Sequence, residues 1–97
     1  MLVRILRRAK MDMIHARDFY DEQQMGLGSY FIDSLTAEID ALKWFAGIHP
    51  VYRGFYKLVA RRFPYSVYYK VFEDVVKVYA VLDNRRSPLR NDRRLGV

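Results

Sequence analysis

The stretch that decides the fold is residues 54–82, GFYKLVARRFPYSVYYKVFEDVVKVYAVL. Within it, side chains first alternate between two sides, then become β-branched and aromatic, and finally form the most apolar run of the chain. A period of two, interrupted by Pro64 and by the acidic pair Glu73-Asp74, is typical of antiparallel strands joined by short turns. We therefore expect a meander of three strands at residues 54–62, 65–72 and 75–82.

Upstream of this meander the apolar period is that of a helix. Residues 9–23 place Ala9, Met13, Ala16 and Tyr20 on one face, and a second helix is expected from residue 27 or 29 to residue 45. Gly47 and Pro50 come after that second helix and end it. Between the helices the glycines of Met25-Gly26-Leu27-Gly28 break the pattern, and Ser29 can cap the second helix. The pattern indicates a hairpin of two helices.

A brief alternation at residues 2–7 predicts one more strand, whose neighbour in the sheet the sequence does not determine. The expected order is then β-α-α-β-β-β. We predict an α+β fold in which a helical hairpin packs on one face of a mainly antiparallel four-stranded sheet. Residues 1–97 are expected to form a single domain, with a basic C-terminal tail at about residues 85–97.

The charge is concentrated in the second half of the chain. The net charge is +6; residues 1–50 carry 6 basic and 7 acidic residues, and residues 51–97 carry 11 basic and 4 acidic residues. Such a field favours an anionic partner, either nucleic acid or an acidic protein. The absence of cysteine excludes disulfides and thiolate metal sites, and two distant histidines do not form a ligand set, so neither a metal nor a cofactor is expected. Neither a signal peptide nor a membrane span is recognisable, which predicts a cytoplasmic protein.

Three segments resemble those of the RelE/ParE toxin superfamily of type II toxin–antitoxin systems. They are the helix-hairpin segment Phe19-Tyr20-Asp21-Glu22-Gln23 with Gly26-Leu27-Gly28 and Phe31, the segment Arg61-Arg62-Phe63-Pro64-Tyr65-Ser66-Val67-Tyr68-Tyr69, and the last strand Val78-Tyr79-Ala80-Val81-Leu82 with Arg85-Arg86-Ser87-Pro88. The resemblance covers about residues 3–90 and implies a toxin neutralised by a cognate antitoxin. In this superfamily the RelE branch cleaves messenger RNA on the ribosome, whereas the ParE branch poisons DNA gyrase.

The residues of the RelE chemistry are largely absent from this chain. In the RelE pattern an arginine follows the tyrosine of the third strand, but here Ser66 follows Tyr65. No tyrosine or histidine follows Arg85-Arg86. The strand tyrosines titrate near 10 when unperturbed, and Tyr68 and Tyr69 should point to opposite faces, so most belong to the core. The chain therefore resembles the ParE or plasmid stabilisation branch more closely, and we expect no catalytic residues.

The best functional hypothesis from the sequence is a toxin that inhibits DNA gyrase by binding and is neutralised by an acidic, partly disordered antitoxin. Lys57 and Arg61 are expected to share a strand face; they are able to hold a phosphate or an acidic antitoxin, or are simply solvated. The basic tail is either a binding element or a solvated end. The alternatives are a RelE-like ribosome-dependent mRNA endoribonuclease and a decayed toxin that only binds its antitoxin. Candidate residues for binding the target or the antitoxin are Lys57, Arg61, Arg62, Arg85, Arg86 and Arg90.

Overall fold

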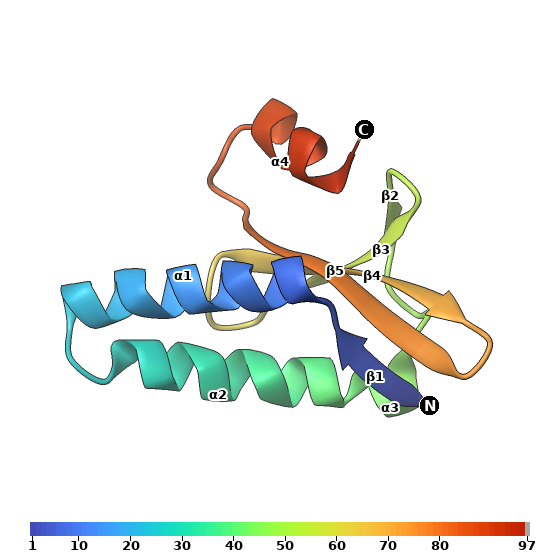
Figure 1. Cartoon of the computed structure of the whole chain (residues 1–97), viewed down its shortest axis with the longest axis horizontal. Helices are drawn as coiled ribbons and strands as arrows, with labels where there is room; N and C mark the ends of the chain where they lie inside the picture. Colours follow the sequence, from blue (N-terminus) through green and yellow to red (C-terminus); the bar gives the residue numbers. More distant parts are fainter. Residues whose placement is uncertain (97) are drawn as a thin grey trace.

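The computed structural model of the chain describes residues 1–96 and contains one sheet with helices on both of its sides (Figure 1). The helical hairpin packs on one side, and a short C-terminal helix lies apart from it beyond the last strand (Figure 1). No helix among these residues is long and apolar enough to cross a membrane. The elements are β1 (Leu2–Ile5), α1 (Arg7–Gln23), α2 (Leu27–Asp40), α3 (Leu42–Phe45), β2 (Val51–Tyr52), β3 (Phe55–Val59), β4 (Tyr65–Phe72), β5 (Val75–Asp83) and α4 (Pro88–Leu95).

The sheet has the strand order β1-β5-β4-β3-β2. β1 pairs in parallel with β5, and the other neighbours are antiparallel, so the predicted α+β class and the meander are confirmed. The predicted number of four strands is wrong, because the two-residue β2 adds a fifth strand at the edge. A strand this short carries no periodic signal. It is folded onto β3 by a tight turn in which Arg53 and Gly54 both have positive φ, 53° and 85°.

The main core lies between the sheet and the helical hairpin. All four apolar residues predicted for one face of α1 are buried, together with Phe31, Leu35 and Ile39 of α2. The second helix does not run unbroken to residue 45 as predicted: α2 ends at Asp40, and α3 is a separate short turn. The predicted cap at Ser29 is also wrong, since α2 begins at Leu27 behind Gly26, whose φ is +89°.

A smaller apolar cluster occupies the opposite face of the sheet. Tyr69 belongs to the main core and Tyr68 to this second cluster, as the alternation predicted. The register between β4 and β5 shifts at this point, because Tyr68 pairs with Ala80 but Tyr69 pairs with Val78. Tyr79 is therefore the extra residue of a β-bulge. The second cluster consists of Phe55, Tyr68, Ala80, Leu82 and Leu95.

The close approach of α1 and α2 depends on Gly28. Its amide donates a 2.7 Å hydrogen bond to the carboxylate of Asp21, which satisfies a free N–H group in the first turn of α2. A Cβ atom at Gly28 would lie 2.4 Å from the backbone oxygen of Arg17. Since that neighbour is backbone, the two helices would have to move apart to make room.

The loop after α3 is fastened to the core through Tyr69. The amide of Gly47 donates a 2.9 Å hydrogen bond to the Tyr69 hydroxyl, and that hydroxyl lies 2.6 Å from Nδ1 of His49. The hydroxyl oxygen accepts from the Gly47 amide, and its own hydrogen is able to bond to Nδ1 when that nitrogen is unprotonated. Burial lowers the pKa of His49, and the nearby carboxylate of Glu38 opposes this shift only in part.

We predict that Gly28→Ala lowers the free energy of unfolding by about 1–3 kcal/mol, because the added methyl group overpacks the helix contact. The matched control is Ser29→Ala, at an exposed neighbour in the same helix, which should change it by no more than about 0.5 kcal/mol. Urea denaturation of both variants gives the comparison. Equal stabilities would contradict the close approach of α1 to α2.

We also predict that His49 makes stability depend on pH. The folded state favours neutral His49, so its contribution is complete above the unfolded-state pKa of about 6.5 and is lost as the pH falls through the lower folded-state pKa. His49→Gln keeps an acceptor but cannot titrate. The stability of the original protein should therefore fall more steeply than that of the variant between pH 7.5 and pH 5 in urea melts. Parallel pH profiles would exclude this role for His49.

Candidate functional site

The basic tail contains the helix α4, which the sequence analysis did not predict. Ser87 caps it, since its hydroxyl accepts a 3.2 Å hydrogen bond from the amide of Arg90. Pro88 occupies the first turn, where the missing N–H group costs nothing. Gly96 ends the helix with a φ of 81°. A capping serine, a proline in the first turn and a terminal glycine are typical of a helix, although most of the residues between them are polar.

Contacts on two sides hold α4 against the sheet. Leu95 packs into the second apolar cluster. Asp92 accepts a 2.7 Å hydrogen bond from the hydroxyl of Tyr52 and lies 3.4 Å from the guanidinium of Arg53. On the side toward α1, the guanidinium of Arg94 binds the carboxylate of Asp12. The helix is therefore a fixed part of the fold.

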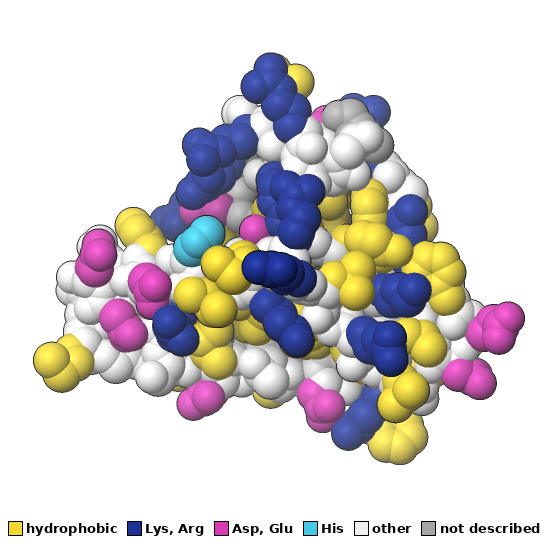
Figure 2. Space-filling model, viewed as in Figure 1, with side chains coloured by type: hydrophobic (Ala, Val, Ile, Leu, Met, Phe, Trp, Pro, Cys, Tyr) yellow, Lys and Arg dark blue, Asp and Glu magenta, His cyan; other side chains and the backbone are white. Residues whose placement is uncertain are grey.

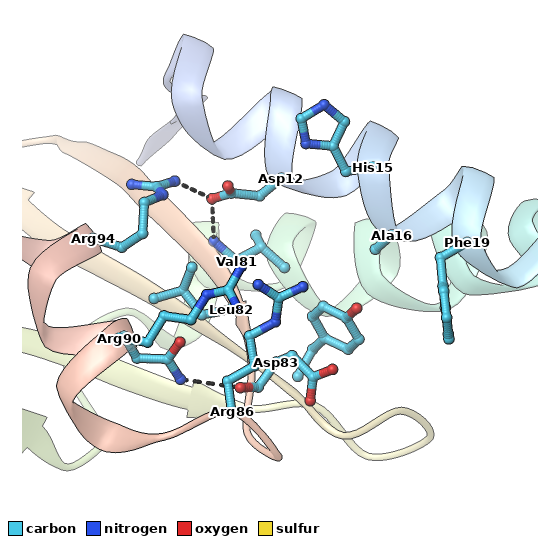
Figure 3. Close-up of a pocket in the computed structure, with 12 residues that line it drawn as sticks. Asp12, His15, Ala16, Phe19, Val81, Leu82, Asp83, Arg86, Arg90 and Arg94 are labelled. Carbon is cyan, nitrogen blue, oxygen red and sulfur yellow. Dashed lines mark hydrogen bonds and ion pairs between the residues drawn. The ribbon is translucent and has the colours of Figure 1, made fainter.

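A cleft of about 340 Å³ opens between α1, β5 and α4 (Figure 3). We call it the arginine cleft. Its basic wall carries Arg86, Arg90 and Arg94, and its α1 wall carries Asp12, His15 and Phe19 (Figure 3). Figure 3 shows that these two walls face each other across the end of β5.

Two of the cleft's arginines are free to bind an anion. Arg94 is paired with Asp12, whose carboxylate also accepts a 3.0 Å hydrogen bond from the backbone amide of Val81. Arg86 and Arg90 are exposed, and within residues 1–96 neither side chain forms an ion pair. Guanidinium groups bind phosphate and carboxylate through paired N–H donors. The cleft is therefore suited to binding an anionic group.

Asp83 at the rim of the cleft is already neutralised by Arg85. Their closest side-chain contact is 2.8 Å, and the Arg85 amide lies 2.8 Å from the same carboxylate. Burial alone would raise the pKa of Asp83, but the hydrogen bonds from Arg85 outweigh it and hold that pKa below its usual value. The pair leaves Arg85 with less free charge than its two basic neighbours in the cleft.

The six residues proposed from the sequence do not form one surface. Arg86 and Arg90 share the cleft, and Arg85 stands beside them in its pair with Asp83. Arg62 binds the hydroxyl of Tyr30 in α2, and the amide of Arg61 donates to the carboxylate of Glu38 at 3.2 Å. Both therefore lie against the second helix.

Lys57 lies on the other face of the sheet, with its ammonium 5.1 Å from the ring centre of Tyr52 and 5.8 Å from that of Tyr68. The expectation that Lys57 and Arg61 share a strand face is wrong. β3 ends at Val59, and Arg61 lies in the bend after it, where its amide bonds to Glu38 of α2, so Arg61 is not part of a strand face.

The cleft residues missed by the sequence analysis are Asp12, His15, Phe19 and Arg94. Asp12, His15 and Phe19 lie on the side of α1 that the apolar periodicity assigns to solvent. Their proximity to the C-terminal residues of the cleft produces no periodic pattern in the sequence of α1. The signal for Arg94 was present: Arg86, Arg90 and Arg94 recur every four residues, which is the spacing of one helix face.

The sheet tyrosines are poorly suited to proton transfer. Burial raises the pKa of Tyr65, Tyr68 and Tyr69, so each holds its proton more firmly than a free tyrosine. Ser66, where the RelE pattern has an arginine, is buried, and its hydroxyl donates a 2.7 Å hydrogen bond to the side chain of Asn84. No group of acidic or histidine residues within residues 1–96 is arranged to hold a metal ion.

Comparisons of the sequence with known proteins give no match, since no family model and no curated protein resembles it. The fold does have a solved counterpart. A chain from the chromosomal ParDE TA system from P. aeruginosa superposes with a TM-score of 0.76 at 17% sequence identity, over 84% of this chain and 92% of that chain. At this identity the likeness concerns the fold. The likeness shows that this chain shares the fold of a chain of that system, and the predicted α+β class agrees with it.

Proposed function

We propose that this chain is the toxin of a type II toxin–antitoxin pair and that it acts, like ParE, by binding DNA gyrase. The observation that carries the proposal is the exposed pair Arg86 and Arg90, neither of which forms an ion pair within residues 1–96. Arg86 lies just before a firmly docked helix and Arg90 lies within it, on a fold shared with a ParDE chain. Their charges are exposed and ready to bind an acidic surface of the target. Long-range attraction by such charges also speeds association.

Binding fits the site better than cleavage does. Breaking RNA through its 2′-hydroxyl requires a base near neutral pH, a group that stabilises charge and an acid for the leaving oxygen. The buried sheet tyrosines have raised pKa values, and His49 is engaged with Tyr69. These features support a mechanism in which the toxin blocks its target without breaking a bond itself.

One observation favours the RelE-like alternative. His15 is exposed in the arginine cleft, on the wall facing Arg86 and Arg90 (Figure 3). An imidazole on the wall of a cleft that also carries two guanidinium groups is a combination able to transfer a proton and hold a phosphate. An mRNA endoribonuclease is therefore the second candidate function, with His15 as the residue that would transfer the proton.

The antitoxin in this proposal has an acidic segment that folds on the toxin, with apolar side chains beside it. Tyr20 and Phe31 are buried, whereas 75% of the surface of Trp44 is exposed. Phe45 and Ile48 are exposed next to it. Several exposed large apolar side chains close together in the chain are a suitable binding site for another protein segment.

We predict that induced expression of the chain stops bacterial growth and that the purified protein inhibits gyrase supercoiling while cellular messages stay intact. Arg86→Glu/Arg90→Glu should weaken supercoiling inhibition about tenfold or more, since two favourable charge contacts become repulsive. The control Lys10→Glu/Arg17→Glu makes the same charge change on α1 outside the cleft and should have little effect.

Primer extension on ribosome-engaged messages provides the second measurement. Codon-phased cuts that disappear in His15→Ala, with normal supercoiling, would replace the gyrase proposal by the nuclease.

A further prediction concerns the partner. Affinity purification of the chain from its native cells should recover a small protein whose toxin-binding segment is acidic, and its co-expression should restore growth. Trp44→Ser should weaken that complex, with Met25→Ser as control for an exposed apolar residue far from α3. A partner whose binding segment is neutral or basic would contradict the proposed charge complementarity.

A further inference from the structure

A second hollow of about 340 Å³ lies where the start of α1 meets the end of α4. We call it the terminal pocket. Figure 2 shows Lys and Arg side chains gathered over this part of the surface, with hydrophobic surface beside them. Its basic residues come from two helices far apart in the sequence, and the apolar part of its lining includes two aromatic rings of the sheet. The residues that matter here are Arg7, Arg8, Arg93, Arg94, Phe55 and Tyr79.

The terminal pocket contains an unbalanced positive charge. Arg94 is paired with Asp12, but Arg7, Arg8 and Arg93 are exposed and form no ion pair within residues 1–96. Among the described residues, none that lines the pocket is acidic. The first turn of α1 likewise holds no acidic residue. Like charges brought together in this way repel one another, and a bound anion would remove that repulsion.

The aromatic part of the pocket is shaped by the β-bulge. Because Tyr79 is the extra residue of β5, its ring lies on the same face as Ala80 instead of alternating with it. There it meets Phe55 edge to face, with ring centres 5.4 Å apart. Lys70 extends across both rings, 4.6 Å from the centre of Phe55 and 5.6 Å from that of Tyr79. The half-buried Tyr79 thus offers a flat apolar surface among cations.

We infer that the terminal pocket binds a nucleotide unit, with its phosphate on Arg7, Arg8 and Arg93 and its base against Tyr79. The paired N–H groups of a guanidinium match the oxygens of a phosphate, and an aromatic ring stacks with any nucleobase. An acidic peptide would satisfy the arginines but would leave the aromatic ring without a flat partner. A free nucleotide and one nucleotide of a single strand share this chemistry. The inference does not rest on the proposed function, since it needs neither gyrase nor an antitoxin.

Titration calorimetry of the whole chain with four probes tests the inference: pyrophosphate, ADP, a single-stranded RNA pentamer and hexaglutamate. ADP should bind more tightly than pyrophosphate, and hexaglutamate should bind more weakly than the pentamer. Arg7→Gln/Arg8→Gln/Arg93→Gln should weaken ADP binding about tenfold or more, because charge-assisted hydrogen bonds to the phosphates are lost. The control Lys10→Gln/Arg17→Gln/Lys43→Gln removes the same charge outside the pocket. Equal losses in the two triple variants would mean diffuse attraction and overturn the site.

Tyr79→Leu separates base binding from phosphate binding. Leucine keeps apolar packing on Phe55 but removes the flat ring, so ADP should bind about fivefold or more weakly while pyrophosphate binding stays unchanged. A loss for both probes, or for neither, would overturn the role of Tyr79. The same titrations distinguish a nucleic acid strand from a free nucleotide as the natural ligand. Much tighter binding of the pentamer than of ADP identifies a strand, and equal affinities identify a free nucleotide. Tighter binding of hexaglutamate than of either would replace the nucleotide by an acidic protein.

Discussion

The carboxylate of Asp12 connects the parts of the molecule that carry its charge. β1 pairs with β5 only as far as Val78, so the amide of Val81 on the same edge has no strand partner. A buried N–H group left without an acceptor is costly, and Asp12 supplies the acceptor from α1 at 3.0 Å. The negative charge placed there requires a cation, and Arg94 of α4 provides it. The position of α4 relative to α1 thus depends on one unpaired strand edge.

That ion pair also separates the two basic hollows of the surface. Arg94 lines both of them and is neutralised in doing so. Within residues 1–96, Arg86 and Arg90 form no ion pair on one side, and Arg7, Arg8 and Arg93 form none on the other. The distribution of charge between the two halves of the sequence does not predict where these basic side chains gather on the surface. Two of the arginines in the terminal pocket belong to the half whose net charge is −1, and only the meeting of α1 with α4 brings them beside the tail.

The sequence predicted the elements whose own side chains create a repeating pattern. The buried faces of α1 and α2 and the three strands of the meander belong to this group, because each covers one side of a core. The elements that were missed owe their stability to tertiary contacts. β2 has two residues and is held by its turn, and α4 has a single buried apolar side chain, Leu95, in an otherwise polar helix. Ser87 and Pro88 are a recognisable helix start in the sequence, but the basic, mostly polar composition after them favoured a tail without a helix.

The same distinction explains which candidate site residues the sequence could place together. Arg86 and Arg90 line one cleft because they stand only four positions apart in the chain: Arg86 directly precedes the cap Ser87, and Arg90 lies in the first turn of α4. Lys57 and Arg61 also stand four apart, but the alternation that joined them stops at Val59. His15 and Arg7 line these hollows together with residues that stand some 70 or more positions later in the sequence. Their roles are set by the packing of α4, which no local pattern reports. The proposed binding function needs such cations exposed to a partner, and the repulsion among them is offset by the apolar cores that fix the two helices in place.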